Sequence, residues 1–361
     1  MNRNILYTPN QPEDVQPLIF KTTDKSYKKF CENLPVSMII VDEIEAQLKG
    51  LIKSRNPSQK FTDEDWQMIL PEFLGATHLD DYGVWVYYPW LNKLVHLLDE
   101  EEFIELRTNR NKYKLTQEEQ AVLRTKKVGV IGLSVGHAIA TSMAMERVCG
   151  AMHLADFDEL ELSNLNRIRT GVQNLGLKKT TIAAREIAEI DPFIKVTIYS
   201  EGIQDYNMES FFTNESTIDL LVEVCDGIEQ KIASRLMAKE LRIPVVMDTN
   251  DRGMIDIERF DLEPQRPLLH GLAAGLTPET LANQTMEERI NTVMRIVDFE
   301  NTSDKLKYSM NEIGKTISSW PQLASSVLLG GAVTTDVVRR VFLNELKSSG
   351  RFYVDLDQLI Q

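Results

Sequence analysis

Apolar and polar residues follow two different patterns along the chain, and the change falls near residue 126. Beyond that point, short apolar runs typical of buried strands lie at 128–132, 152–156, 196–200, 219–226 and 244–248. Segments with helical periodicity separate several of them, at 138–148, 179–190 and 231–241. This alternation predicts an α/β fold, namely a Rossmann-like, doubly wound, mainly parallel sheet with helices on both faces.

The flanking segments have other patterns. After residue 250 we expect an antiparallel strand at 254–261, a helix near 278–297 and a last apolar helix near 323–342. Residues 1–105 predict a smaller, separate α+β module with an apolar-periodic stretch, a helix and an aromatic strand pair, at 38–51, 66–74, 82–89 and 94–98. The expected domains are therefore 1–105, an accessory module, and 106–361.

Composition narrows the classes of function. The 361 residues carry 40 Lys+Arg and 54 Asp+Glu, which gives a net charge of −14. Because polyanions are bound mainly by clustered cations, nucleic-acid partners and anionic membrane surfaces are not expected. The polar start at 1–10 does not resemble a signal peptide, and the longest weakly polar stretch is too short to span a bilayer, so we expect a cytoplasmic protein. Its three cysteines form no CxxC pair, and no zinc is expected.

The first predicted strand ends in a turn of the kind that binds phosphate. Gly132 ends the strand, and Ser134 and Gly136 follow in the sequence Gly-Leu-Ser-Val-Gly. A glycine here allows a tight turn, so that amides at the next helix's N-terminus can face a phosphate. The pattern departs from GxGxxG, because Ser134 replaces the second glycine and Gly136 comes one place early.

Charged residues at later strand ends add to this turn. Asp156 follows Gly132 by 24 residues, which suits an acid that binds ribose hydroxyls and fits NAD or ATP equally. Arg167, Lys179 and Asp226 then supply two cations and a lone carboxylate. Attack on a nucleotide α-phosphate needs cations for the developing charge and an oxygen ligand for Mg²⁺, whereas a dehydrogenase does not, so the set points to nucleotidyl transfer.

These motifs together resemble those of a known family. Residues 128–226 resemble the adenylation domain shared by ThiF, MoeB and the ubiquitin-activating enzymes, through the glycine turn, Asp156-Phe157-Asp158, Ser163-Asn164-Leu165-Asn166-Arg167, Gly176-Leu177-Lys178-Lys179 and the strand-ending Asp226. Upstream, Arg107-Thr108-Asn109-Arg110-Asn111 is similar to the family's R-x-N-R-Q segment. The resemblance covers about 107–342 and leaves the N-terminal hundred residues outside it.

The resemblance implies a role for each matching residue. Gly132, Ser134 and Gly136 would frame the nucleotide turn, Asp156 would hold the ribose, and Asp158 is also implied to bind the nucleotide. The residues implied to bind and neutralise the triphosphate are Arg110, Asn164, Arg167 and Lys179, with Lys178 the weaker alternative to Lys179. Asp226 would hold Mg²⁺. In the family the counterpart of Arg110 commonly reaches the partner subunit's site, which implies a homodimer.

The expected function is an ATP- and Mg²⁺-dependent adenylyltransferase that activates a carboxylate, at the C-terminus of a small carrier protein or peptide. Two alternatives stay open: a catalytically silent nucleotide-binding scaffold, and an NAD-binding oxidoreductase. The chain departs from family members with zinc-binding CxxC pairs or a later nucleophilic cysteine, since no cysteine follows Cys225, which we expect to be buried and inert. The end at 351–355 is compatible with a junction to a further module or with a natural terminus.

Overall fold

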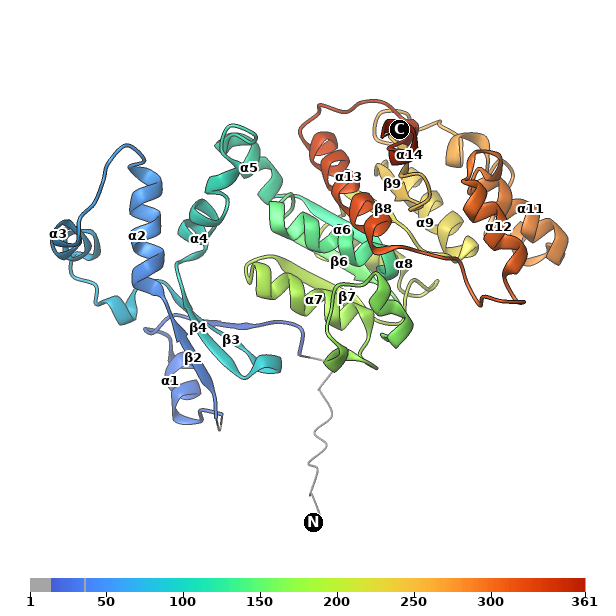
Figure 1. The fold of residues 1–361 in the computed structure, drawn as a ribbon. Helices are drawn as coiled ribbons and strands as arrows, with labels where there is room; N and C mark the ends of the chain where they lie inside the picture. The colour runs from blue at the N-terminus through green and yellow to red at the C-terminus, as the bar shows by residue number, and fades with distance from the viewer. Residues whose placement is uncertain (1–13, 36, 361) are drawn as a thin grey trace, which may run out of the picture. The chain divides into compact units, whose positions relative to one another are not determined.

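The structure, a computed structural model, describes residues 14–35 and 37–360, so the polar start at 1–10 lies outside the described residues. It consists of two compact units, 1–117 and 118–361 (Figure 1). The predicted division at 105 and 106 into an accessory module and an adenylation domain concerns function and stays a prediction. Within the described ranges, no helix is both long and apolar enough to cross a membrane.

The first unit is built on a four-stranded sheet of order β1-β3-β4-β2, in which only the β2–β4 pair is parallel. The predicted aromatic strand pair is confirmed as β3 and β4. The predicted apolar stretch 38–51 divides into β2 and α2, because the Asp42 carboxylate accepts a hydrogen bond from the Ile44 N–H and starts the helix. The elements are β1 Leu18–Phe20, α1 Lys25–Glu32, β2 Ile39–Asp42, α2 Ile44–Arg55, α3 Asp63–Leu74, β3 Val84–Tyr88, β4 Lys93–Leu97 and α4 Glu100–Arg107.

The second unit is the predicted α/β fold. Its seven-stranded sheet has the order β11-β10-β9-β8-β5-β6-β7 (Figure 1). The five neighbouring strands β9, β8, β5, β6 and β7 are parallel, and β10 pairs antiparallel with both β9 and β11. The strands are β5 Lys127–Ile131, β6 Ala151–Ala155, β7 Lys195–Tyr199, β8 Leu220–Glu223, β9 Val245–Asp248, β10 Met254–Glu258 and β11 Gly350–Tyr353. Because the parallel strands point the same way, their carboxyl ends share one edge, where ligands of such sheets bind.

Helices cover both faces of this sheet. Val130 packs on Gly136 of α6, whereas its neighbour Gly129 faces Phe211 of α8, and successive strand residues point to opposite faces. Helix α6 contacts both α7 and α13 over the first face, and α8 and α9 lie on the second. The helices are α5 Gln117–Arg124, α6 Leu133–Glu146, α7 Lys179–Ile190, α8 Met208–Thr213, α9 Ile228–Glu240, α10 Pro278–Ala282, α11 Met286–Ile296, α12 Asp304–Glu312, α13 Ala324–Phe342 and α14 Leu356–Leu359.

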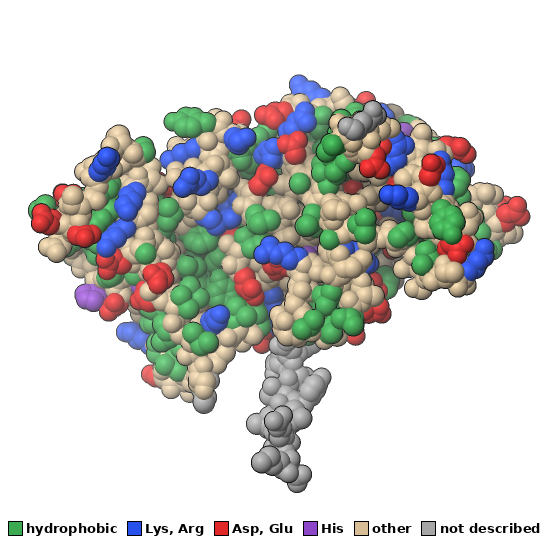
Figure 2. Space-filling view, in the orientation of Figure 1, with side chains coloured by type: hydrophobic (Ala, Val, Ile, Leu, Met, Phe, Trp, Pro, Cys, Tyr) green, Lys and Arg blue, Asp and Glu red, His purple; other side chains and the backbone are tan. Residues whose placement is uncertain are grey.

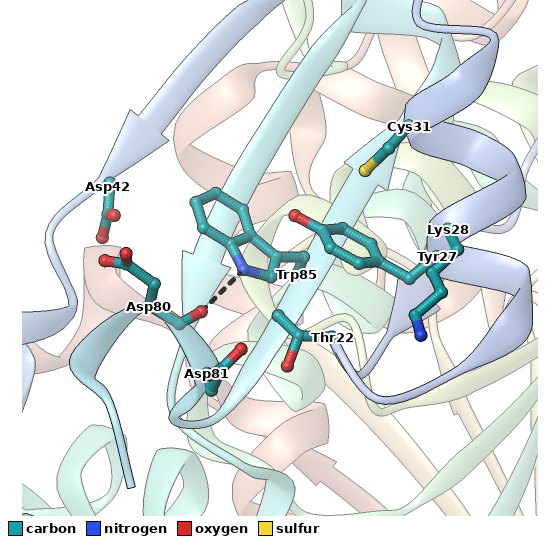
Figure 3. A pocket seen from close by; sticks show the side chains of 8 residues that line it. All are labelled: Thr22, Tyr27, Lys28, Cys31, Asp42, Asp80, Asp81 and Trp85. Carbon is teal, nitrogen blue, oxygen red and sulfur yellow. Dashed lines mark hydrogen bonds between the residues drawn. The ribbon is translucent and has the colours of Figure 1, made fainter.

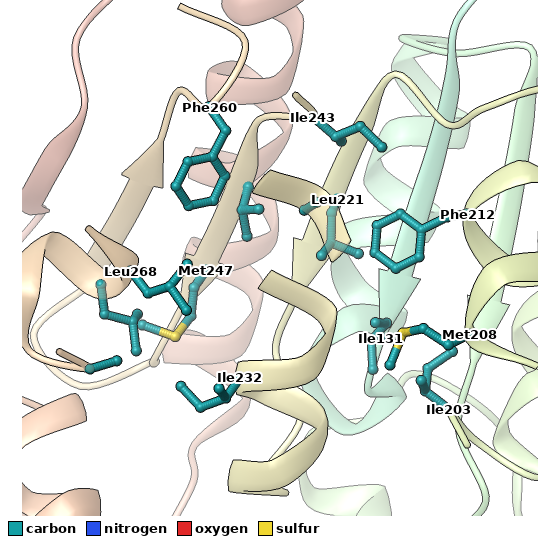
Figure 4. Packing of buried hydrophobic residues seen from close by; sticks show 14 of the residues in the cluster. Ile131, Ile203, Met208, Phe212, Leu221, Ile232, Ile243, Met247, Phe260 and Leu268 are labelled. Carbon is teal, nitrogen blue, oxygen red and sulfur yellow. The ribbon is translucent and has the colours of Figure 1, made fainter. Parts of the chain in front are cut away.

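The core on the second face is continuous from β5 to β10. It contains buried side chains from strands, from α8 and α9 and from the segment after β10, among them Ile131, Phe212, Leu221, Ile232, Met247, Phe260 and Leu268 (Figure 4). Because helices cover both faces of the sheet, the strand residues that point to either face are buried. The sequence therefore shows continuous apolar runs at these strands instead of strict alternation. This core fixes the strand ends that carry the candidate site.

Three predicted elements have different limits in the structure. The single helix expected at 278–297 is wrong: it is two helices, because Thr285 accepts a hydrogen bond from the Glu288 N–H and begins α11 anew. The helix expected at 138–148 begins already at Leu133, directly after the Gly132 turn. The strand expected at 219–226 ends at Glu223, whose side chain accepts the Cys225 N–H and so replaces the next sheet hydrogen bond.

Acidic and basic side chains are interspersed over the face seen in Figure 2. No broad basic area is visible on that face. The mixture of both signs on this face is compatible with the net charge of −14.

Candidate functional site

The Gly132 turn has the geometry that its glycine predicts. Gly132 has φ of +90°, and a Cβ built on it would lie 2.8 Å from the backbone N of Cys225. Both the backbone conformation and the close approach therefore exclude other residues. Gly136 lies one turn into α6, where a Cβ would come 2.7 Å from Val130 Cγ1, so it permits close packing of helix on strand. The turn and the N-terminus of α6 thus meet at the carboxyl edge of β5.

Asp156 connects the end of β6 to this turn. Its Oδ2 accepts a hydrogen bond from the Leu133 N–H at 2.6 Å, and its Oδ1 accepts one from the Asp158 N–H at 2.8 Å. The side chain is buried, and burial raises its pKa, while Lys179 and the two amides act in the opposite direction. Each oxygen keeps a second lone pair, so the carboxylate can orient the turn and still accept a hydrogen bond from a ligand hydroxyl.

Lys179 is the central cation of the site. It is the first residue of α7 and is only 4% exposed, and its Nζ lies 2.6 Å from Asp158 Oδ2 and 3.1 Å from Ser134 Oγ. Ser134, which stands where the fingerprint has a glycine, is therefore an acceptor for this ammonium group. Lys178 instead donates to the Phe157 carbonyl at 2.7 Å. Of the two lysines, only Lys179 contacts residues of the glycine turn.

Arg167 and Asp226 form the second pair of charges. Arg167 follows a 3₁₀ turn at Leu162–Asn166, and Asp226 lies three residues beyond β8, on an exposed loop. Burial lowers the pKa of Arg167, and the carboxylate of Asp226 opposes that shift, so the two charges interact. Arg167 Nη1 donates to Asn166 Oδ1 at 2.9 Å, and its buried Nε has no hydrogen-bond partner among the described residues.

The remaining predicted residues are placed differently. Asn164 is buried, and its Oδ1 accepts the Glu161 N–H at 3.0 Å, so the amide closes the local turn. Asn166, and not Asn164, contacts the guanidinium of Arg167. Arg110 is exposed and lies in the 3₁₀ turn Asn109–Asn111 of the first unit, and its role stays a prediction.

Cys225 is only partly buried and lies two residues beyond the end of β8, so it is not inside the strand as expected, and its inertness stays a prediction. Burial raises the pKa of the thiol well above its usual value, and the nearby Glu223 carboxylate raises it further. A thiol held protonated is a poor nucleophile. Within the described ranges, no group of three or more His, Cys, Asp or Glu side chains is arranged to hold a metal ion.

Two buried acids near this edge were missed by the sequence reasoning. Glu223 is the last residue of β8, and Asp248 is the last residue of β9. The only signal was one acidic residue within or at the end of an apolar strand, and in both cases that residue could equally have been a solvated strand end. Burial, with exposures of 0% for Glu223 and 4% for Asp248, distinguishes them.

A cavity of about 560 Å³ lies in the first unit. Its walls come from α1, the end of β2, the turn before β3 and β3 itself (Figure 3). Trp85 stacks on the buried His96 at a centroid distance of 4.1 Å, and burial first, with Cys31 and two aspartates adding to it, raises the pKa of Tyr27 to about 12. The lining residues are Thr22, Tyr27, Lys28, Cys31, Asp42, Asp80, Asp81 and Trp85.

Comparison with known proteins assigns the family. A family model for the ThiF family matches residues 107–315, which is more than half of the chain. Uncharacterized protein MT1398 of Mycobacterium tuberculosis (strain CDC 1551 / Oshkosh) is 41% identical over 287 residues, which are 78% of this chain and 40% of that protein. The chain belongs to the ThiF family.

Other similar proteins share shorter or more distant matches. Ubiquitin-like modifier-activating enzyme 5 of Drosophila willistoni is 28% identical over 127 residues, 33% of this chain and 31% of that protein, so the chain spans less than half the length of either curated relative. Among solved structures, E. coli MccB with MccA-N7isoASN aligns with a TM-score of 0.49 and 13% identity over 86% of this chain and 88% of that one. E. coli tRNA N6-threonylcarbamoyladenosine dehydratase with ATP aligns with a TM-score of 0.47 and 16% identity over 67% and 95%.

Proposed function

We propose that this chain is an ATP-dependent adenylyltransferase that activates a carboxylate as an acyl-adenylate. The observation that carries the proposal is the set of charges at the carboxyl ends of the strands: Lys179 beside the Gly132 turn, and Arg167, which interacts electrostatically with Asp226. Membership of the ThiF family and the relatives named above support the same reaction class. An NAD-dependent reaction would leave these cations without a use.

The proposed reaction exchanges one bond for another at the α-phosphorus of ATP. A carboxylate oxygen of the substrate attacks this phosphorus, the bond to the bridging oxygen breaks, and pyrophosphate leaves with the electron pair. Amides at the N-terminus of α6 and the ammonium of Lys179 would bind phosphate oxygens, and the guanidinium of Arg167 would stabilise the charge that develops. Lys179 would exchange its contacts with Asp158 and Ser134 for phosphate oxygens when ATP binds.

Asp156 and Asp226 take separate roles in the proposal. Asp156, which two backbone amides already orient, would accept a hydrogen bond from a ribose hydroxyl. Asp226 would hold Mg²⁺, and its chemistry fits, because this ion is typically bound by one or two carboxylates together with substrate phosphates. When bound, Mg²⁺ would supply positive charge to the triphosphate. Asp158 would position Lys179 until the phosphates arrive.

The substrate and the assembly are the finer parts of the proposal. We expect the carboxylate to be the C-terminus of a small carrier protein or peptide, with a homodimer in which Arg110 completes the site of the partner subunit, in the cytoplasm, where ATP is available. Light scattering would report the dimer. Mixing Arg110→Ala with Arg167→Ala protein should partly restore activity if each subunit completes the other's site, and no recovery would contradict the shared site.

The proposal is tested by exchange of labelled pyrophosphate into ATP, with candidate acceptor peptides present. Wild-type protein should catalyse exchange, and Arg167→Ala and Asp226→Ala should each abolish it with little change in melting temperature. Two matched controls are Arg169→Ala, an exposed arginine two residues from Arg167, and Asp205→Ala, an exposed aspartate. An equal loss of exchange in a control variant and in the site variant that it matches would refute the assigned roles. Binding of ATP without exchange for any acceptor would favour a silent scaffold.

A further inference from the structure

The loop from β8 to α9 carries Asp226 and also packs against the Gly132 turn. Cys225 precedes Asp226, and its backbone N and Cα lie 2.8 and 2.9 Å from the position that a Cβ on Gly132 would occupy. The preceding residue is fixed as well, since the Val224 N–H donates to the Ile131 carbonyl at 2.9 Å. A shift of the Cys225 peptide would therefore change both the packing of the Gly132 turn and the place of Asp226.

Glu223 holds this peptide in place. Its Oε1 accepts the Cys225 N–H at 3.0 Å, in a bond from residue i to residue i+2 that closes the end of β8. Glu223 itself is fully buried. A backbone N–H bonded to a buried carboxylate is a strong, charge-assisted contact, so the loop cannot leave this position without breaking that bond and taking this acceptor away from the Cys225 N–H.

The carboxylate is in turn fixed from helix α9. Lys231 Nζ lies 2.9 and 2.8 Å from its two oxygens, and Arg235 Nη1 donates to Oε2. Both cations are buried. Burial alone would raise the pKa of Glu223, but the two cations hold it at about 2, so the group is ionised at neutral pH.

We propose that Glu223 is a positioning residue that holds the Cys225 peptide, and with it Asp226, beside the Gly132 turn and so sets the affinity of the site for Mg²⁺ with ATP. The inference rests on the proposed function, because it needs Asp226 to be the Mg²⁺ ligand. Groups that orient metal ligands from behind typically change metal affinity 10- to 100-fold when they are mutated. Glu223 acts through the Cys225 peptide and does not itself contact ligand in this account.

Glu258 offers a matched control from the same network. It is equally buried, its Oε2 accepts from Arg235 at 2.8 Å, and its Oε1 accepts a backbone N–H, that of Leu269, at 2.6 Å. The two glutamates thus have the same chemistry and share a cation, but Glu258 anchors the segment after β10. A general loss of network stability would affect both variants, whereas a role in positioning Asp226 belongs to Glu223 alone.

The test is the Mg²⁺ concentration that gives half-maximal ATP binding, measured by calorimetry on the full chain. In Glu223→Gln the amide oxygen is drawn to Lys231 and Arg235, which leaves the amide nitrogen facing the Cys225 N–H and breaks that bond. We expect the half-maximal Mg²⁺ concentration to rise about tenfold or more. Glu258→Gln should leave it unchanged, and Glu223→Asp should restore it, because an aspartate readily accepts the N–H two residues on. A folding defect would reduce the fraction of protein that binds without moving this concentration.

Should Glu223→Gln not fold, the charge-balanced pair Glu223→Met with Lys231→Met carries the same test, since buried ion pairs often tolerate apolar replacement. A half-maximal Mg²⁺ concentration like that of wild type in the variant that folds, or an equal rise in Glu258→Gln, would overturn the positioning role alone. Wild-type protein that binds no ATP at any Mg²⁺ concentration would instead overturn the proposed function, and the positioning role with it.

Discussion

Two buried carboxyl groups lie at the ends of neighbouring parallel strands of the second unit, and their surroundings shift their pKa values in opposite directions. Glu223 at the end of β8 faces α9 and contacts two buried cations, which hold its pKa at about 2. Asp248 at the end of β9 faces α13, and no described residue gives its Oδ2 a hydrogen-bond partner. Burial raises the pKa of Asp248 to about 7, despite backbone N–H bonds from Asn250 and Thr249.

The contrast shows that burial by itself does not decide the charge of an acid in this sheet. A buried carboxylate is stable as an ion only if cations and hydrogen bonds replace its lost hydration. Glu223 has those partners and is a rigid anchor, whereas Asp248 lacks a cation and is close to balance between its two protonation states at neutral pH.

The largest effect is expected from removing the cation shared by the network. Arg235→Met leaves Glu223 and Glu258 buried with only Lys231 to balance them, and breaking such a buried pair costs about 3–5 kcal/mol. The free energy of unfolding should fall by that amount in urea titrations near neutral pH. Lys195→Met, at an exposed lysine of β7, should change it by less than about 0.5 kcal/mol. Equal effects in the two variants would show that the network is not compensated as described.

Asp248 should make the free energy of unfolding depend on pH with the opposite sign to Glu223. The folded-state pKa of Asp248 is about 7 against an ordinary value of 3.8, so between these values the folded state holds a proton that the unfolded state has lost. Stability from this group therefore falls as pH rises from about 4 to 7, by as much as about 4 kcal/mol for three pKa units. The Glu223 contribution is present above its ordinary pKa of 4.5 and is lost only as pH falls toward about 2.

Asp248→Asn should remove this slope and stabilise the protein at pH 8 relative to wild type. Urea titrations at several pH values between 4 and 8 would measure it, with Asp205→Asn at an exposed site as the control. Parallel curves for wild type and Asp248→Asn would mean that the carboxyl group has a partner that keeps its pKa near the ordinary range.

Gly330 tests the space around Asp248. A Cβ on Gly330 would lie 2.1 Å from Asp248 Oδ2, so Gly330→Ala should destabilise the protein by about 1–3 kcal/mol. In an Asp248→Ala background the same change should cost little, because the colliding oxygen is gone, and alanine is the better helix former. Urea unfolding of the four proteins measures the coupling. Ser325→Ala, on an exposed position of the same helix, is the control, and additive effects in the cycle would contradict the contact.

The smallest effect is expected at Ser134. Its hydroxyl and Asp158 both hold the Lys179 ammonium, and an ordinary hydrogen bond contributes about 1 kcal/mol. Ser134→Gly should therefore release Lys179 toward phosphate and tighten ATP binding by up to about fivefold in calorimetry. Lys178→Met should leave the affinity unchanged, because Lys178 points to the Phe157 carbonyl. Weaker binding in Ser134→Gly would instead mean that the hydroxyl itself contacts the nucleotide.

Much of the second unit was predictable from the sequence, because parallel strands buried on both faces appear as apolar runs and the glycine turn has few alternatives. The five parallel strands, the α7 limits at 179 and 190 and the antiparallel β10 followed from such runs. The residues at which elements end could not be predicted from these runs. Side-chain caps at Glu223 and Thr285 decided them, and a periodic pattern does not record which side chain bonds to the backbone.

The sequence was enough to name most residues of the candidate site, but it was not enough to predict which of them contact one another. Motif order located Asp156, Lys179 and Asp226, but the pairing of Lys179 with Ser134 joins residues 45 positions apart and needed the fold. The same holds for Glu223 and Asp248, whose acidic side chains look alike in sequence. Their difference arises from helices α9 and α13 on opposite faces, and α13 lies far along the chain.

In the proposed function, the charges at this sheet edge bind ATP with Mg²⁺. The most direct measurement is calorimetric titration of ATP into the wild-type chain and into folded Asp226→Ala protein, each with and without Mg²⁺. The account predicts that wild type binds ATP and that Mg²⁺ strengthens the binding, while Asp226→Ala loses the strengthening. Absence of ATP binding by wild type in both buffers would contradict it.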